Sequence, residues 1–116
     1  MVCETQRPDA ANDLKQLLKL LGARVPGLVE MLNVQDIVFA DGVLSSKFKY
    51  LIAISMAVAD RCDGTIGHHV EKALLAGASR QEILEAVAVA VFMHGPSSMF
   101  SGAEALAFVT QFEAVN

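Results

Sequence analysis

The stretch SRQE at 79–82 constrains the fold more than any other part of this sequence. A serine followed three residues later by a glutamate forms a capping box, because each side chain can hydrogen-bond a backbone N–H of a first helical turn. The following stretch AVAVAVF at 86–92 alternates like a buried strand when it is taken alone. The capping box ahead of it favours a helix, and so do the apolar residues at helical spacing, Ile83, Ala86, Val87, Ala90 and Val91.

Most of the remaining chain shows the same helical periodicity. Gly22 and Pro26 are expected to end the first helix and to open the second. Ser45 or Ser46 is expected to cap the third helix. The predicted helices span about 9–21, 26–39, 46–60, 63–77, 81–94 and 97–112. The sequence therefore predicts an all-α bundle of five or six helices in a single domain over 1–116, with 1–8 expected to be mobile.

Each predicted helix carries an apolar face that we expect to pack against its neighbours. The third helix, KFKYLIAISMAVA at 47–59, is apolar almost all round in its later half and is expected to be central. The faces predicted for the others are Leu14, Leu17, Leu18 and Leu21 in the first, Leu28, Val29, Leu32 and Val38 in the second, Val70, Leu74 and Leu75 in the fourth, and Phe100, Ala103, Ala107 and Phe108 in the last.

The composition indicates a chain that associates with copies of itself. Hydrophobic residues make up 53% of the 116 residues and charged residues 19%, and a small domain buries such an excess poorly because of its surface-to-volume ratio. The net charge of −4, with no cluster of Lys and Arg, argues against nucleic acid as a partner. The longest uncharged apolar stretch, 51–59, is too short for a membrane span, and no signal peptide is recognisable. We therefore expect a cytoplasmic homo-oligomer.

One stretch, RCDGTIGHH at 61–69, gathers the residues that could carry chemistry. If a helix begins near Asp63, Cys62 lies at its N-terminus, where the helix dipole favours a thiolate. Thr65 and His69 are one turn apart on the same face, so Cys62, Thr65 and His69 would form one stripe with His68 rotated away. His69 is then a candidate base. The Asp63 carboxylate opposes a second negative charge beside it.

Plainer interpretations of these residues remain open. A lone cysteine often behaves as a small buried hydrophobe, and a histidine pair on a helix often has one packed and one solvent-facing member. We expect no metal and no cofactor, because Cys62, His69 and His94 do not follow an established zinc spacing. His94, at the end of a predicted helix, is expected to neutralise the helix C-terminus. Cys3 and Cys62 do not make a disulfide framework.

The stretch from LSSKFKY through RCDGTIGHHVEKALLAGASRQEILEAV to MHGPSSMF resembles the carboxymuconolactone decarboxylase family, which includes the alkylhydroperoxidase AhpD-like proteins. The resemblance covers about 38–112 and implies an all-helical fold assembled as a trimer or hexamer. Peroxidase-like members carry a glutamate, then Cys-x-x-Cys, then a histidine four residues later. Here Cys62 and His69 match the first cysteine and the histidine, while Thr65 and Tyr50 stand where the second cysteine and the glutamate are expected.

The resemblance implies two enzymatic hypotheses. The first is a thiol-dependent peroxidase of antioxidant, peroxiredoxin type, with Cys62 as the reactive thiol, His69 as the base, and Tyr50, Thr65, His68 and Asp63 as supporting residues. Because Thr65 excludes an intramolecular disulfide at this position, an external thiol, or Cys3, would have to reduce the oxidised cysteine. The second is a decarboxylating lyase that acts on a small carboxylic acid or lactone, with His69 as general base. A third hypothesis is that the chain is a non-catalytic, oligomeric protein that binds a small molecule.

Overall fold

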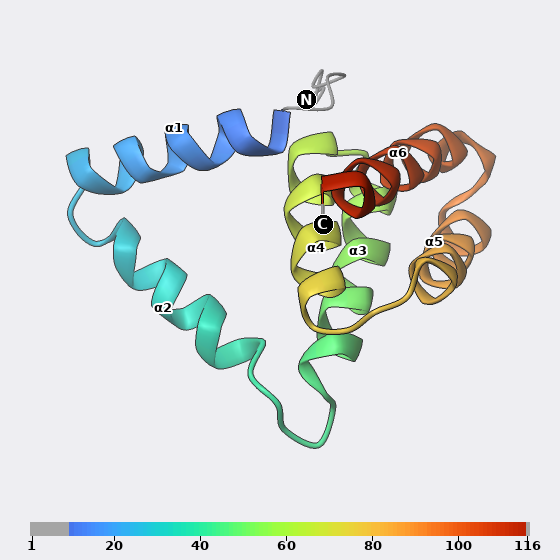
Figure 1. Ribbon diagram of the computed structural model, residues 1–116, viewed down its shortest axis with the longest axis horizontal. Helices are drawn as coiled ribbons and strands as arrows, with labels where there is room; N and C mark the ends of the chain where they lie inside the picture. Colours follow the sequence, from blue (N-terminus) through green and yellow to red (C-terminus); the bar gives the residue numbers. More distant parts are fainter. Residues whose placement is uncertain (1–9, 116) are drawn as a thin grey trace.

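The computed structural model describes residues 10–115, with side chains from 16 to 114, and contains no strand within that range. Its helices are α1 (Ala10–Arg24), α2 (Leu28–Val38), α3 (Ser46–Asp60), α4 (Asp63–Leu75), α5 (Arg80–His94), the short 3₁₀ helix η1 (Pro96–Ser98) and α6 (Met99–Val115). Helices α3 to α6 pack together as a body, while α1 and α2 extend from it as an open arm (Figure 1). The predicted all-α fold of five or six helices is confirmed, with six α-helices in the described part of the chain.

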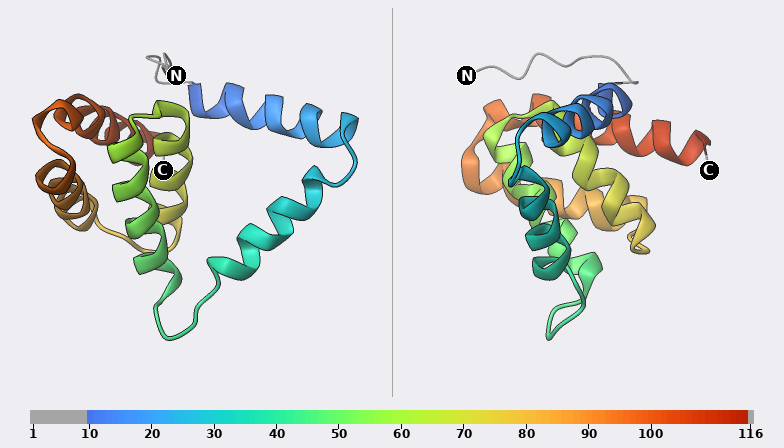
Figure 2. Two further views of the ribbon diagram at one scale, coloured as in Figure 1. Left: turned by 180° about the vertical axis from the view of Figure 1, so that it is seen from behind. Right: turned by 90° about the vertical axis from the view of Figure 1, so that its left-hand side faces the viewer.

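Helix α3 lies at the centre of the body and contacts α4 and α5 along its length (Figure 2). It contributes four buried residues to the core, as its largely apolar sequence predicts. Helices α4, α5 and α6 close around it. The buried apolar residues are Tyr50, Ile54, Ala57, Val58, Ile66, Val70, Ala73, Ala78, Ile83, Val87, Ala90, Ala105, Phe108, Val109 and Phe112.

Side-chain caps start α3 and α5 where the sequence predicts them. The Ser45 hydroxyl accepts a hydrogen bond from the Phe48 N–H at 3.3 Å, and the Ser79–Glu82 capping box is complete. In that box the Glu82 N–H donates to Ser79 Oγ at 3.0 Å and the Ser79 N–H donates to Glu82 Oε1 at 2.9 Å. The hydrogen bond with the Ser79 backbone, followed by that with Lys47, lowers the pKa of Glu82. The 3.0 Å ion pair between Lys47 and Glu82 also joins the starts of α3 and α5.

Two glycines let α6 approach its neighbours closely. A Cβ at Gly67 of α4 would lie 2.8 Å from the Phe108 ring, and a Cβ at Gly102 of α6 would lie 2.8 Å from Val87 Cγ1. These small residues fix which side of α6 is buried. The buried side consists of Ser101, Gly102, Ala105, Phe108, Val109 and Phe112. The predicted stripe is therefore wrong except for Phe108, because Phe100, Ala103 and Ala107 are exposed.

The predicted apolar faces of α1 and α2 exist but are exposed. Leu17, Leu18 and Leu21 of α1 are exposed, while the side chain of Leu14 lies outside the described range. In α2, Val29, Leu32 and Val38 are exposed, Leu28 is half-buried, and the helix has no buried residue. The prediction that they face the core is wrong, since no other described element covers them.

Three smaller expectations are corrected. Helix α1 does not stop at Gly22 but continues to Arg24, because a helix tolerates an interior glycine; the left-handed φ of 98° falls on Gly27, which caps α2. Pro26 therefore precedes α2 rather than opening it. Leu75, the last residue of α4, is exposed, whereas Val70 is buried and Leu74 is partly buried against the core. Within the described residues no helix is long and apolar enough to cross a membrane.

Candidate active site

A tight connection between α3 and α4 places Cys62 at the start of α4. Helix α3 ends at Asp60, and its C-cap residue Arg61 adopts a left-handed conformation with φ 57° and ψ 46°. The Cys62 N–H then donates to the Ala57 carbonyl at 3.3 Å, and Cys62 is the N-cap residue of α4. Its side chain makes no capping hydrogen bond, so the sulfur is not used to satisfy the helix N-terminus. The predicted location of Cys62 at the beginning of a helix is confirmed.

The sulfur of Cys62 contacts the hydroxyl of Thr65. Thr65 Oγ1 donates a hydrogen bond to Cys62 Sγ over 3.2 Å. Thr65 is exposed and Cys62 is half-buried. A hydroxyl donor and the positive end of the α4 dipole both favour the thiolate over the thiol. Thr65, whose side chain cannot form a disulfide with Cys62, thus donates a hydrogen bond to the Cys62 sulfur.

Asp63, the first residue of α4, is directed away from solvent and is only 4% exposed. Burial, and then the nearby Glu104 of α6, raise the pKa of its carboxyl group. Burial and a neighbouring carboxylate thus both act against the charged form of Asp63 beside Cys62.

His68 and His69 lie together one to two turns further along α4. Their rings meet edge to face, with centroids 5.2 Å apart. Burial, and then the neighbouring His68, lower the pKa of His69 to about 4. His69 is therefore neutral at pH 7. Its Nδ1 is buried and has no hydrogen-bond partner among the residues whose side chains are described.

Aromatic rings from two other elements enclose His69. Phe39, which follows α2, stacks on Tyr50 of α3 with centroids 4.4 Å apart, and the His69 ring lies 5.9 Å from Phe39 and 6.3 Å from Tyr50. Burial, and then the charge of Asp36, raise the pKa of Tyr50, while a hydrogen bond with Gln35 lowers it. The same Gln35 donates its Nε2 hydrogen to His68 Nε2 over 3.0 Å. When neutral, His68 then carries its proton on Nδ1.

The structure therefore groups the predicted residues into two adjacent sets, each of which includes residues of α4. Cys62 and Thr65 form one set at the helix start. Tyr50, His68 and His69 form the other, together with Gln35 and Phe39; we call these five residues the histidine cluster. Cys62 and His69 are seven residues apart, about 10 Å along the helix axis, and Thr65 lies between them.

Gln35 and Phe39 are the two site residues that sequence reasoning missed. Gln35 lies near the end of α2 and Phe39 directly follows it, in a segment whose apolar residues predict only burial in the core. Gln35 lies between Asn33 and Asp36 in LNVQDIVFA at 32–40, so no local signal distinguishes it from its polar neighbours. Its pairing with His68, 33 positions away, requires the tertiary fold.

Several predicted features lie apart from the site. His94 is the last residue of α5 and is exposed. Cys3 lies outside the described residues. Among the residues that the structure describes, no three His, Cys, Asp or Glu side chains are grouped to hold a metal ion.

Comparison with known proteins gives consistent matches. Residues 30–108 match the sequence model of the carboxymuconolactone decarboxylase family. Uncharacterised protein 4 of the cox locus of Paracoccus denitrificans is 34% identical over 82 residues, covering 71% of this chain and 74% of the relative. The apo crystal structure of a carboxymuconolactone decarboxylase family protein from Legionella pneumophila has a TM-score of 0.83 at 34% identity, covering 89% of this chain and 93% of the other.

A more distant structure shows the same fold. It is a family protein from Thermotoga maritima for which a part in the antioxidative response has been suggested, with a TM-score of 0.79 and 23% identity over 91% of each chain. At this identity the likeness concerns the fold alone. The matched residues 30–108 run from within α2 to within α6 and include every residue of the two sets.

Proposed function

This chain belongs to the carboxymuconolactone decarboxylase family, and on that premise we propose that it is a thiol-dependent peroxidase that works through one cysteine, Cys62. The observation that carries the proposal is the hydrogen bond from Thr65 to Cys62 Sγ at the N-terminus of α4. A reactive cysteine needs a stabilised thiolate and access for its substrate. The hydroxyl donor at Thr65 supports a thiolate at Cys62, and the position of half-buried Cys62 beside exposed Thr65 supports access for a substrate.

The proposed reaction takes place in two stages. The Cys62 thiolate attacks the terminal oxygen of a hydroperoxide, the O–O bond breaks, and the sulfur is oxidised to a sulfenic acid while the leaving alkoxide takes a proton to become an alcohol. An external thiol then attacks the sulfenic acid, giving a mixed disulfide and water. A second external thiol releases Cys62 in its reduced form and leaves as part of a disulfide.

His69 is the proposed proton acceptor for this site. A pKa of about 4 leaves the imidazole neutral at physiological pH and free to accept a proton, and it makes His69 a weaker base than an ordinary histidine. Thr65 is four residues before His69 and therefore neighbours it on the helix, while its hydroxyl already touches the sulfur. The Thr65 hydroxyl is thus the group through which a proton leaving Cys62 would pass toward His69.

The two cysteines of the chain provide the matched test. We expect the full-length protein to consume an alkyl hydroperoxide when dithiothreitol is supplied as the external thiol. Cys62→Ser should abolish this consumption, and Cys3→Ser should retain it. Activity that survives in Cys62→Ser contradicts the proposal. Activity that is lost in Cys3→Ser while Cys62 is still oxidised assigns Cys3 as the resolving thiol instead of an external one.

A second candidate is a lyase that uses His69 as the general base on a small carboxylic acid or lactone. The observation that favours it is the neutral His69 ring against Phe39 and Tyr50, an environment suited to an organic substrate. This reading needs no reactive thiol. Decarboxylation of 4-carboxymuconolactone that persists in Cys62→Ser and disappears in His69→Gln would support the lyase over the peroxidase.

A further inference from the structure

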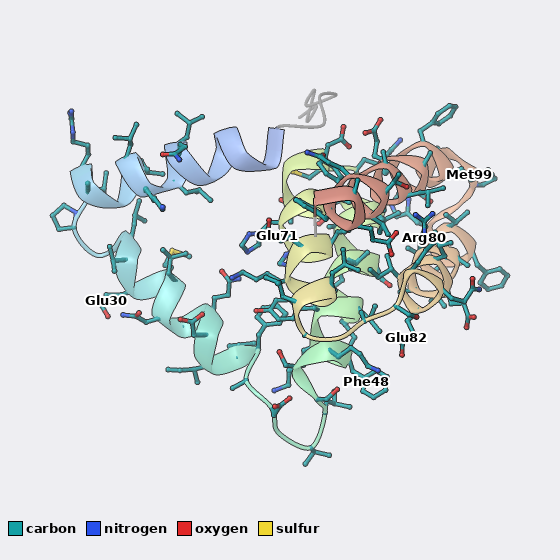
Figure 3. All side chains as sticks on the ribbon, in the orientation of Figure 1. Glu30, Phe48, Glu71, Arg80, Glu82 and Met99 are labelled. Carbon is teal, nitrogen blue, oxygen red and sulfur yellow. The ribbon has the colours of Figure 1, made fainter. Side chains whose placement is uncertain are left out.

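Helix α2 turns a polar side chain toward the body of the protein and leaves large apolar residues outside. Gln35 is half-buried, whereas Val34, Ile37 and Val38 beside it are 56–75% exposed. Side chains at the C-terminal end of α2 extend toward α4, while labelled Glu30, nearer the start of the helix, lies on the outer side (Figure 3). Burial of apolar surface normally decides which side of a helix faces the core. The inward position of Gln35 therefore calls for polar contacts as its cause.

The amide group of Gln35 makes two such contacts within the histidine cluster. Its Nε2 lies 3.0 Å from His68 Nε2. Burial, and then the charge of Asp36, raise the pKa of Tyr50, and a hydrogen bond with Gln35 opposes this rise. A hydrogen bond that lowers the pKa of a phenol is one that is donated to its charged form. Because an amide NH₂ group has two hydrogens, Gln35 can donate one to Tyr50 of α3 and one to His68 of α4.

The end of α2 is anchored to α3 close to this amide. The ammonium group of Lys49 donates to the carbonyls of Val38 and Ala40 at 2.9 and 2.7 Å. Carbonyls at the end of a helix lack partners within the helix, so Lys49 caps α2 as well as joining it to α3. Phe39 stacks on Tyr50 with ring centroids 4.4 Å apart. These contacts fix the backbone one turn after the bridging amide and so hold the amide within reach of both partners.

The contact with Gln35 decides which nitrogen of His68 carries the proton. An amide nitrogen donates and does not accept, so His68 Nε2 is the acceptor and the neutral ring has its proton on Nδ1. A neutral imidazole has one basic nitrogen, and in His68 that nitrogen is already bound. His69 differs, because its buried Nδ1 has no hydrogen-bond partner among the described side chains. The two adjacent histidines are therefore chemically inequivalent.

We propose that Gln35 is a positioning residue of the candidate site, which ties Tyr50 to His68 and holds His68 in the Nδ1–H form, so that of the two histidines only His69 offers an unpaired ring nitrogen to a substrate. Gln35 acts through His68 and Tyr50 and does not touch the reacting atoms. Its part in catalysis rests on the proposed function, whereas its effect on the proton of His68 does not.

NMR of the full-length protein labelled with ¹⁵N measures the tautomer directly, because long-range proton–nitrogen correlations distinguish the ring nitrogens and the chain has three histidines. At about pH 8, above the usual pKa of histidine, His68 should be bare at Nε2 and protonated at Nδ1. Gln35→Glu keeps the side-chain length, but its carboxylate only accepts, so the His68 proton should move to Nε2. Gln35→Leu removes the donor, and the Nε2–H form should appear. The wild-type spectrum and Gln35→Leu decide the question if Gln35→Glu fails to fold.

Controls come from α5. The tautomer of exposed His94 should be the same in every variant. Gln81→Glu makes the same chemical change at an exposed position, where the Gln81 amide donates to Glu85 at 3.1 Å, and should leave His68 as in the wild type.

Reactivity separates positioning from a general loss of structure. In the Cys3→Ser background, Gln35→Leu should slow hydroperoxide consumption severalfold and leave the rate of Cys62 alkylation by iodoacetamide unchanged, because Gln35 acts on the histidine cluster and not on the sulfur. Gln81→Glu should change neither rate.

Four results would overturn the proposal. Wild-type His68 protonated at Nε2 contradicts the bridge. A His68 tautomer that is the same in the wild type and in both Gln35 variants shows that another group sets it. Equal losses of hydroperoxide consumption and of Cys62 alkylation in Gln35→Leu indicate a structural role only, and unchanged consumption excludes any positioning role. If the wild type consumes no hydroperoxide, the proposed function fails, while the tautomers still decide whether Gln35 sets the proton of His68.

Discussion

Replacing Thr65 by valine removes the hydroxyl that donates to Cys62 Sγ and keeps the β-branched shape. Thr65 is exposed, so the substitution leaves the core intact. A hydrogen bond to a charged group contributes about 1.5–3 kcal/mol in general, and solvent exposure reduces this to about 1–1.5 kcal/mol here. Because the donor stabilises the charged form, its loss should raise the pKa of the Cys62 thiol by about one unit.

The rate of alkylation by iodoacetamide measures this effect directly. Below the pKa, a rise of about one unit lowers the thiolate fraction about tenfold, while the more basic thiolate becomes about threefold more nucleophilic. We therefore expect Thr65→Val to react about three- to fourfold more slowly than the wild type at pH 7, and faster on the high-pH plateau. Thr65→Ser keeps the donor and should behave like the wild type.

The Cys3→Ser background isolates the signal of Cys62 in these experiments. An unchanged thiol pKa in Thr65→Val would refute the role assigned to the 3.2 Å contact. If the thiol pKa shifts equally in Thr65→Val and Thr65→Ser, the cause is a change in packing and not the lost hydrogen bond. That result would also refute the role assigned to the contact.

Three further outcomes are expected. Thr65→Cys should form a disulfide with Cys62 on mild oxidation, seen as a loss of two thiols by mass spectrometry, because the two side chains already touch. Folding lowers the pKa of His69 to about 4, so the unfolded chain binds one more proton than the folded chain as the pH falls from about 6.5 toward 4, and stability is lost in that window. The urea midpoint of His69→Gln should therefore fall less between pH 7 and pH 4.5 than the midpoint of the wild type. Gly67→Ala places a Cβ 2.8 Å from a core ring and should destabilise the protein by about 1–2 kcal/mol in urea, whereas Gly22→Ala, whose nearest neighbour is 3.5 Å away, should be neutral or stabilising.

Controls for these outcomes come from the same chain. His94→Gln, at an exposed position, should keep the wild-type pH dependence. If His94→Gln reduces the pH dependence of the urea midpoint as much as His69→Gln does, burial of His69 is not the cause of that dependence. A Thr65→Cys variant that keeps two free thiols after oxidation would place the two positions further apart than the structure does. Equal urea midpoints for Gly67→Ala and Gly22→Ala would contradict the close approach of α6 to α4.

Local signals predicted the helices well because their causes are local. Ser45 and Ser79 cap α3 and α5 through hydrogen bonds within four residues, and the apolar pattern of α3 reflects its burial. The burial of α6 could not be predicted in the same way. Phe100 is more apolar than Gly102, yet Gly102 faces the core because α5 approaches too closely for a side chain there.

The residues of the candidate site also divide into those that local sequence signals predict and those that only the tertiary fold brings together. The N-terminal position of Cys62 and its proximity to Thr65 follow from helix geometry and a helix start that the sequence indicates. The enclosure of His69 by Phe39, and the hydrogen bond from Gln35 to His68, join segments about 30 residues apart. No local pattern specifies such pairs. The apolar residues of α1 and α2 likewise follow a pattern that predicts burial, yet the structure leaves most of them exposed.

The most direct test of the peroxidase proposal is whether hydroperoxide oxidises Cys62 to a sulfenic acid. The full-length protein is treated with one equivalent of an alkyl hydroperoxide in the presence of dimedone, which traps sulfenic acids, and the labelled residue is located by peptide mass spectrometry. We predict labelling at Cys62 that is retained in Cys3→Ser and slowed in Thr65→Val. Unlabelled Cys62 after complete consumption of the peroxide, or no consumption at all, would contradict the proposal.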